Sequence, residues 1–253
     1  MSQNRVSVEQ IRHWQEARPI LAITAYDYPI ARHLDEAGAD ILHVGDSLGM
    51  VVLGMENTTG VTMSDMLRAT QSVARARKRA LITADLPYQS YRTVGEAVQN
   101  SRLLIEAGAD AVKMEGGEEI ALQTLAVREA GIELQGHLGM LPQHIIEEGG
   151  YKKKGRVEEE ILRLLRDANF LQSAGAFSII LEAVVSEVAE RITRELIIPT
   201  IGIASGNGTS GQIQVCTDLL GLTPWWKFPH VKPMAQLGAD IQTAVDRYRK
   251  NLT

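Results

Sequence analysis

Three carboxylates stand at the ends of short apolar runs in this chain. Asp46 lies in VGDSLGM, Asp85 in ITADLPY and Glu115 in AVKMEGGE, and in each segment apolar residues come before the acidic side chain. If these runs are strands of an α/β barrel, their carboxyl ends converge on one mouth, so the three side chains meet. Like charges brought that close require a cation or a proton between them. Asp46, Asp85 and Glu115 are therefore predicted to hold one metal ion.

Further polar residues occupy the same kind of position. They are Ser47 after the second run, Lys113 in the fourth, His137 in the fifth and Glu182 in the sixth. Lys113 and Glu115 are two positions apart, so on a strand both side chains point into the mouth. Each residue alone has an ordinary structural explanation, such as a loop cap, a core histidine or an ion pair. Their occurrence together at one end of consecutive strands favours an active site.

The residue types indicate what such a site would do. Oxygen ligands without a nearby Cys or His pair are typical of Mg²⁺. If a 2-oxo acid chelates the ion, the metal and Lys113 stabilise charge on the keto oxygen as the neighbouring carbon loses its proton. Glu182 lies on a different strand from the predicted ligands and is the candidate base. His137 either shares that task or orients the substrate, and the pattern leaves open which of the two is the base.

Eight short runs can supply the strands that position these residues. Near-continuous apolar character is typical of parallel strands covered on both faces, and the intervening stretches suit crossover helices. The predicted fold is an α/β (β/α)8 TIM barrel, a single domain over 1–253 with an N-terminal capping helix and a C-terminal helix. The predicted strands are 19–26, 41–47, 80–87, 111–116, 132–139, 178–184, 199–205 and, more weakly, 212–218.

Local signals support this arrangement. Residues 7–17 form a helical pattern in which Ser7 and Gln10 make a capping box, and this helix is predicted to plug the lower end of the barrel. The phrase EAGAD occurs twice, so Gly38 and Gly108 are predicted to end helices, and SAGAF is a third copy. The loops 48–61 and 140–155 are long, which is typical of binding loops or lids.

Composition limits the classes of partner. The 253 residues carry a net charge of -5 with the signs interspersed, which argues against nucleic-acid binding and favours a small-molecule substrate. The basic run 75–79 is predicted to be a solvated helix end. Cys216 is the one cysteine, so no intrachain disulfide is possible. We find no signal peptide and no apolar stretch that could span a membrane, and we expect a soluble, cytoplasmic protein.

A family resemblance covers essentially the whole chain. VGDSLGM with the following VVLG, then TADLPY, VKMEGGE, GHLGMLPQ, GGYKKKGR and ILEAV, occur in this order and resemble the ketopantoate hydroxymethyltransferase family. The resemblance implies a Mg²⁺-dependent barrel that transfers a hydroxymethyl group from 5,10-methylenetetrahydrofolate to 3-methyl-2-oxobutanoate in pantothenate synthesis. It also implies a homo-oligomer, a decamer in several members.

The same resemblance implies roles for individual residues. Asp46, Asp85 and Glu115 match the carboxylates associated with the metal, and Glu182 matches the proton acceptor. Contacts with the substrate are implied for Asp46, Ser47, Asp85 and Lys113.

Departures from the family pattern avoid the metal and base positions. The family usually has proline at the position of Gly60 in this chain. It has His-Thr at the position of Ala69-Thr70 and Arg-Gly at the position of Arg77-Lys78. After the seventh strand the family has G-I-G-A-G, whereas this chain reads GIASG with Ala204. Later it has Asp-Gly-Gln and His-Asp where this chain reads SGQ and CTD. These changes are predicted to alter the walls of the mouth.

Three alternatives follow from this pattern. In the first, the chain is a divergent relative that acts on another 2-oxo acid. In the second it is a carbon-carbon lyase, and in the third it is a catalytically silent barrel that serves as an assembly subunit. Lyases of the related Mg²⁺ barrels use a KKCGH-like loop, and Cys216 has no such context.

Overall fold

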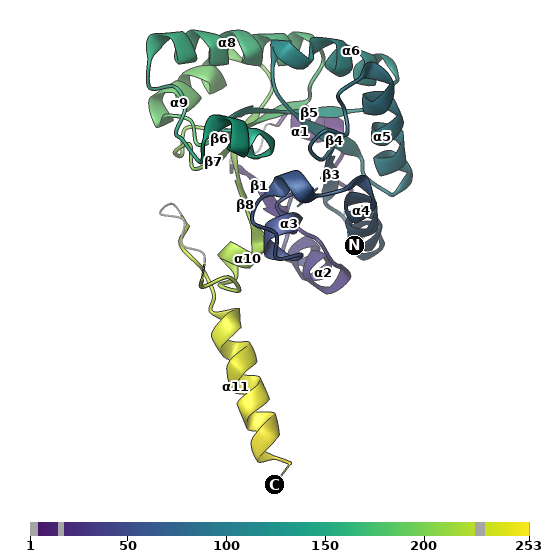
Figure 1. Cartoon of the computed structure of the whole chain (residues 1–253), viewed down its shortest axis with the longest axis vertical. Helices are drawn as coiled ribbons and strands as arrows, with labels where there is room; N and C mark the ends of the chain where they lie inside the picture. The colour runs from purple at the N-terminus through teal and green to yellow at the C-terminus, as the bar shows by residue number, and fades with distance from the viewer. Residues whose placement is uncertain (1–4, 15–17, 226–230, 253) are drawn as a thin grey trace. The chain divides into compact units, whose positions relative to one another are not determined.

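Eight parallel strands pair in chain order and close into a barrel (Figure 1). The structure, a computed structural model, describes residues 5–14, 18–225 and 231–252. The strands are β1 (Ile20–Thr24), β2 (Ile41–Val44), β3 (Leu81–Asp85), β4 (Ala111–Glu115), β5 (Leu134–Gly139), β6 (Ser178–Glu182), β7 (Thr200–Ile203) and β8 (Gly211–Gln214). Each lies within a predicted run or begins one residue before it, so the predicted TIM barrel is confirmed.

Helices connect each strand to the next from β1 to β7, as is usual for parallel pairing, while residues 204–210 join β7 to β8 without a helix. The longer ones are α2 (Tyr28–Glu36), α4 (Met63–Ala76), α5 (Val94–Glu106), α6 (Ala121–Glu129), α8 (Glu158–Ser173) and α9 (Ser186–Glu195). In Figure 1, α4, α5, α6, α8 and α9 lie on the outside of the strands. Because helices cover their outer face, β2, β3 and β4 are buried at every position, which explains their continuous apolar character.

The two long loops carry short helices. Residues 48–61 contain α3 (Leu48–Val51) and the 3-10 helix η1 (Thr58–Gly60). Residues 140–155 contain the 3-10 helix η3 (Pro142–His144) and α7 (Ile145–Glu148), and a third 3-10 helix, η2 (Glu118–Ile120), follows β4. Both long loops begin at the carboxyl ends of strands, the end at which barrel enzymes bind their substrates.

The N-terminal helix α1 (Val8–Arg12) closes the amino end of the barrel. The Ser7 side chain accepts the backbone N–H of Gln10, and the Gln10 side chain accepts that of Ser7, which confirms the capping box. The helix ends before its predicted limit, and residues 15–17 lie outside the described part. Ile11 is fully buried in one cluster with Ile20, Ile41 and Leu81, which are the first residues of β1, β2 and β3. The predicted plug is therefore present.

Strand register brings the site residues into neighbouring positions. Asp85 pairs with Lys113 across β3 and β4, and Glu115 pairs with His137 across β4 and β5. Gly139 pairs with Glu182 across β5 and β6. Gly139 has φ +103°, and a Cβ there would lie 2.2 Å from the backbone oxygen of Glu182, so only glycine lets the chain turn past β6.

The repeated EAGAD phrase joins the barrel units at their amino ends. Gly38 and Gly108 have φ of +94° and +111°, as expected after helix ends. Asp40 accepts a backbone N–H of β1 and pairs with Arg79 at 2.9 Å. Asp110 accepts a backbone N–H of β3 and pairs with Arg77 at 2.6 Å. Each aspartate of the phrase therefore holds the strand before it.

These ion pairs correct one prediction. The side chains of Arg77 and Arg79 are only 10% and 18% exposed. The basic run 75–79 therefore continues beyond α4 and is not simply a solvated helix end, because two of its arginines neutralise partly or fully buried aspartates.

Contacts divide the chain into two compact units, Met1–Ile213 and Gln214–Thr253. The second contains α10 (Cys216–Leu219) and α11 (Leu237–Lys250), and every residue of α11 is at least partly exposed. That the whole chain forms one domain stays a prediction. A search of the described residues found no helix with the length and apolar character needed to cross a membrane.

Candidate active site

The carboxyl ends of β2 to β6 bring together the residues predicted to do chemistry. Asp46 and Ser47 follow β2, Asp85 ends β3, Lys113 and Glu115 lie on β4, His137 lies on β5 and Glu182 ends β6. All but Ser47 and Glu182 are almost completely buried. So many ionisable groups buried at this end of a barrel indicate a functional site.

Asp46 and Asp85 adjoin each other directly. The backbone N–H of Asp46 donates to Asp85 Oδ2 at 2.9 Å. Asp85 Oδ1 lies 3.1 Å from Lys113 Nζ and 3.1 Å from His43 Nε2. Burial alone would raise the pKa of Asp85, but the charges of Lys113 and His43 outweigh it and lower the pKa below its usual value. Asp85 is therefore ionised at neutral pH.

Lys113 lies among the carboxylates and provides their main positive charge. Its Nζ is 3.1 Å from Asp85 Oδ1, 3.8 Å from Glu115 Oε1 and 2.9 Å from His137 Nδ1. Burial alone would lower the pKa of Lys113, but Asp85, Glu115 and Asp46 raise it above its usual value. The ammonium group is therefore permanently charged in this site.

His137 connects the carboxylate cluster to Glu182. Its Nδ1 lies 3.3 Å from Glu115 Oε1, and its Nε2 lies 3.4 Å from Glu182 Oε2. Burial and the charge of Lys113 oppose protonation, but contacts with Glu115 and Glu182 raise the pKa of His137 overall. Nδ1 can accept a hydrogen bond from Lys113 or donate one to Glu115, and it cannot do both at once. The imidazole thus lies between the two carboxylates.

Asp46 shows that the cluster has too little positive charge. Burial, with the negative charges of Asp85 and Glu115, raises the pKa of Asp46 well above its usual value, although Lys113 and Gln143 oppose the shift. A carboxylate in this position favours a proton or a cation beside it.

The comparison with protein families decides what this site belongs to. The model of ketopantoate hydroxymethyltransferase matches residues 5–253. The chain belongs to the ketopantoate hydroxymethyltransferase family. Two relatives agree with it, and both are 3-methyl-2-oxobutanoate hydroxymethyltransferases. That of Ignicoccus hospitalis is 46% identical over 98% of this chain and 95% of the relative. That of Pyrobaculum aerophilum is 50% identical over 91% of this chain and 88% of the relative.

Solved structures agree on the fold of the family member. An oxaloacetate acetylhydrolase superposes with a TM-score of 0.66 at 17% identity, covering 99% of this chain and 90% of that one. At this identity the likeness shows a shared barrel architecture and nothing about the reaction.

Three residues of this hydroxymethyltransferase site escaped sequence reasoning. His43 on β2 lies against Asp85 through Nε2, and its Nδ1 is 2.7 Å from Thr83 Oγ1. Gln143 on η3 and Tyr91 in the loop after β3 are buried beside Asp46 and Glu115. His43 lies within the apolar run that ends near Asp46. A polar residue in such a run is a signal that could have assigned it to the site.

Ser47, which the resemblance assigns to the substrate, begins α3 and lies at the edge of the cluster. Its Oγ is 2.9 Å from the hydroxyl of Tyr26, which follows β1. The Ser47 side chain makes no capping bond to α3, and its hydroxyl hydrogen-bonds to that of Tyr26 instead.

The Mg²⁺ expected from the family resemblance fits these residues in part. Within the described ranges, no group of three His, Cys, Asp or Glu side chains is arranged as the ligands of one ion. Two buried oxygens, Asp85 Oδ1 and Glu115 Oε1, make ion-pair contacts with Lys113 but no hydrogen bond of good geometry. Mg²⁺ usually binds through one or two carboxylates and fills its other positions with water and substrate. The donor set fits an open site of this kind, in which water and substrate complete the coordination, rather than a closed cage made by the protein alone.

The departures from the family pattern are not all at the mouth. Arg77 bonds to Asp110 and to the backbone oxygen of Ala80, just before β3 begins, so it lies at the amino end of the barrel. The prediction that it alters the walls of the mouth is wrong, because α4 runs back to that end. Ala204 follows β7 at the carboxyl end and has φ +55°, a left-handed conformation that glycine adopts more easily.

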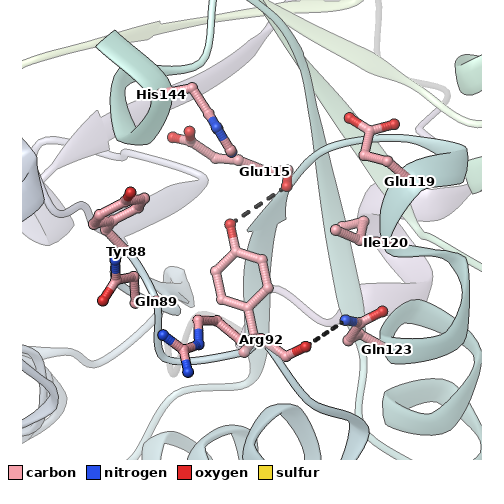
Figure 2. A pocket seen from close by; sticks show the side chains of 9 residues that line it. Tyr88, Gln89, Arg92, Glu115, Glu119, Ile120, Gln123 and His144 are labelled. Carbon is pink, nitrogen blue, oxygen red and sulfur yellow. Dashed lines mark hydrogen bonds between the residues drawn. The ribbon is translucent and has the colours of Figure 1, made fainter. Parts of the chain in front are cut away.

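A pocket of about 260 Å³ lies beside Glu115. Figure 2 shows Tyr88 and His144 on one side of it, Ile120 and Glu119 on the other, and Glu115 between them. A dashed line at the backbone oxygen of Glu115 marks the bond that it accepts from the Tyr91 hydroxyl. The wall of this pocket is therefore bonded directly to β4.

Proposed function

We propose that this chain transfers a hydroxymethyl group to 3-methyl-2-oxobutanoate and so forms 2-dehydropantoate (ketopantoate) in pantothenate biosynthesis. The observation that carries the proposal is the joining of Asp46, Asp85, Lys113, His137 and Glu182 into one connected cluster at the carboxyl end of the barrel. Membership of the family, with relatives of 46% and 50% identity that bear the name of this activity, supports the same reaction. It also makes a silent assembly subunit the weaker interpretation.

Mg²⁺ is the proposed cofactor, held by Asp46 and Asp85, with Glu115 as the third proposed ligand. When bound, it would supply Lewis acidity to the keto and carboxylate oxygens of the 2-oxo acid. The raised pKa of Asp46 supports this assignment, because the cluster lacks positive charge. Ser47 and Lys113 are proposed to contact the substrate together with the two aspartates.

Glu182 is the proposed base. It is the most exposed carboxylate of the cluster, with a side chain 18% exposed, so a substrate can reach it. It takes the proton from C3 of the oxo acid. His137 Nε2 lies 3.4 Å from its carboxylate, so the two side chains are proposed to share the catalytic step. Lys113 remains cationic and stabilises the negative charge that develops on the keto oxygen.

The one-carbon donor proposed from the resemblance is 5,10-methylenetetrahydrofolate. The C3 carbanion forms the new carbon-carbon bond to the donor's methylene carbon, and water supplies the hydroxyl oxygen. Both carbon-nitrogen bonds of that methylene group break, and tetrahydrofolate leaves with its two nitrogens protonated by the proton from C3 and one proton from water. We further propose a cytoplasmic homo-oligomer, with the decamer of several family members as its model, and without nucleic-acid or membrane partners. The aromatic residues of 225–228 are proposed to take part in subunit packing, and of these Trp225 is exposed while Trp226 and Phe228 lie outside the described residues.

The test is ketopantoate formation by the purified full chain from 3-methyl-2-oxobutanoate and the folate donor, with Mg²⁺ and with excess chelator. Product that depends on Mg²⁺ supports the proposal. Folded protein without turnover in either condition contradicts the substrate. A parallel panel of 2-oxo acids, scored by C3 proton exchange, shows whether Ala204 has changed the preferred acceptor.

A further inference from the structure

Each of the three carboxylates at the proposed metal site has one oxygen fixed by a hydrogen bond. Asp85 Oδ2 accepts the backbone N–H of Asp46 at 2.9 Å. Asp46 Oδ2 accepts the side-chain amide of Gln143 at 2.8 Å. Glu115 Oε2 accepts the backbone N–H of Gln143 at 3.1 Å. Gln143 thus supplies two of these three bonds.

The second oxygens of Asp85 and Glu115 make ion-pair contacts but no hydrogen bond of good geometry. Asp85 Oδ1 lies 3.1 Å and Glu115 Oε1 lies 3.8 Å from Lys113 Nζ, and both oxygens are buried. A bond to one oxygen of a carboxylate fixes its plane and thereby aims the other oxygen. Gln143 therefore sets the direction in which Asp46 and Glu115 present their second oxygens.

Gln143 itself has little freedom. Its two amide hydrogens go to Asp46 Oδ2 and to the backbone oxygen of Leu86, the latter at 2.9 Å. The Tyr91 hydroxyl lies 2.7 Å from Gln143 Oε1 and 3.3 Å from the backbone oxygen of Glu115, so its single hydrogen bonds mainly to Gln143 Oε1. Because a phenol hydroxyl donates here to the amide oxygen, the amide nitrogen must face Asp46. Gln143 and Tyr91 are 2% and 7% exposed, so water does not compete for these bonds.

The backbone explains why this loop residue reaches the site. Gly139 turns the chain over β6, and Pro142 then begins η3 with a conformation fixed by its ring. Gln143 follows Pro142 directly, so its N–H is one of the unsatisfied donors at the start of a helix and is free to bond Glu115.

We propose that Gln143, held by Tyr91, is a positioning residue that orients Asp46 and Glu115 for a divalent cation. The inference rests on the proposed function only in taking Mg²⁺ as that cation. Gln143 touches neither substrate nor reacting atoms in this account, and it acts through the carboxylates.

The test measures Mg²⁺ affinity of the full chain by calorimetry in the absence of substrate and donor. Gln143→Leu keeps the size of the side chain and removes both polar atoms, so Mg²⁺ affinity should fall about 10- to 100-fold, the usual effect of losing a partner of a metal ligand. Tyr91→Phe removes a single oxygen from the anchor of the amide and should cause a smaller loss in the same direction.

Gln135→Leu is the matched control. Gln135 is also buried on the barrel, but its amide bonds to Ser178 and to none of the carboxylates. It should lower the thermal midpoint as Gln143→Leu does and leave Mg²⁺ affinity unchanged. Titration with Mn²⁺ in place of Mg²⁺, with the free ion measured by magnetic resonance, gives a second readout that does not depend on turnover.

The outcomes separate this inference from the proposed function. Wild-type affinity in folded Gln143→Leu or, where that variant does not fold, in Tyr91→Phe would overturn the positioning role while the enzyme assignment stands. An equal loss of affinity in Gln135→Leu would overturn it too, since the effect would then be a general one of stability. Absence of Mg²⁺ binding by the wild-type chain would contradict both this role and the proposed metal.

Discussion

His137 Nε2 lies 3.4 Å from Glu182 Oε2, and the two residues belong to the adjacent strands β5 and β6. On its other side the same imidazole lies 3.3 Å from Glu115 Oε1. The proposed base and the proposed metal site are therefore joined through one side chain. Variants at the two ends of this connection should differ in effect. Changes at Glu182 should impair proton removal, and changes at the carboxylates of the proposed metal site should impair cation binding.

Glu182→Gln should slow exchange of the C3 proton of 3-methyl-2-oxobutanoate by roughly 10² to 10⁴, since a positioned general base contributes about that factor. Mg²⁺ affinity should be almost unchanged, because Glu182 is not among the proposed ligands. Proton exchange into D2O, followed by nuclear magnetic resonance, measures the first effect and calorimetry the second. Glu187→Gln, at an exposed carboxylate on α9, is the control. Near-normal exchange in Glu182→Gln would remove Glu182 from the role of base.

Asp46→Ala and Asp85→Ala should each reduce Mg²⁺-dependent C3 exchange by orders of magnitude, because Lewis-acid stabilisation is worth several kcal/mol. Asp85→Ala should also destabilise the fold, since it leaves the Lys113 charge buried without its partner at 3.1 Å. Exchange rates at saturating Mg²⁺ and thermal midpoints distinguish the two effects. The metal assignment fails if both variants still respond to Mg²⁺ as the wild type does.

Mg²⁺ affinity should depend on pH through Asp46. The pKa of this carboxyl is raised by burial and by Asp85 and Glu115, so a proton stays on it at a higher pH than on an ordinary aspartic acid. Mg²⁺ requires the carboxylate and must displace that proton. Affinity should therefore fall as pH decreases through the raised pKa, and binding should release protons. Calorimetry in buffers of different ionisation enthalpy counts them, and a result of zero near neutral pH would show that Asp46 is already ionised.

Asp40→Asn should destabilise the chain and reduce the dependence of its stability on acid. Burial raises the pKa of Asp40, but Arg18, a backbone N–H of β1 and Arg79 outweigh it and lower the pKa overall. Stability from this group is present above its unfolded-state pKa and is lost as pH falls through the lowered value. The expected loss near neutral pH is about 1 to 3 kcal/mol, from urea unfolding curves. Equal slopes of stability against pH below 5 in both proteins would contradict this.

Ala204→Gly should stabilise the chain by about 1 kcal/mol, because an alanine in the left-handed region carries a strain that glycine does not. Its φ of +55° places it in that region. Ala126→Gly, inside α6, should have the opposite effect of about 1 kcal/mol. Destabilisation by both changes would mean that contacts of the Ala204 methyl group outweigh the strain.

The fold and much of the site could be predicted from the sequence, because a parallel barrel converts strand ends into neighbours. Asp85, Lys113 and Glu115 end or nearly end apolar runs, and register alone brings Asp85 opposite Lys113 and Glu115 opposite His137. This rule requires only the strand positions, which continuous apolar character indicates well.

The remaining site residues and the buried arginines could not be predicted, because they depend on how the loops run, which apolar periodicity does not encode. Gln143 reaches the carboxylates because Gly139 and Pro142 turn the loop over β6, and Tyr91 because the loop after β3 folds back. Arg77 and Arg79 were expected in solvent, since their partners Asp110 and Asp40 belong to other βα units. Such pairs become visible only when the units are assembled.

The most direct test of the central claim is exchange of the C3 proton of 3-methyl-2-oxobutanoate into D2O by the wild-type chain, without the folate donor. A cation held at Asp46 and Asp85 should let Glu182 remove that proton before any carbon-carbon bond forms. We expect exchange that requires Mg²⁺ and stops on chelation. Exchange that is equally slow with Mg²⁺ and with chelator, in folded protein, would contradict the account.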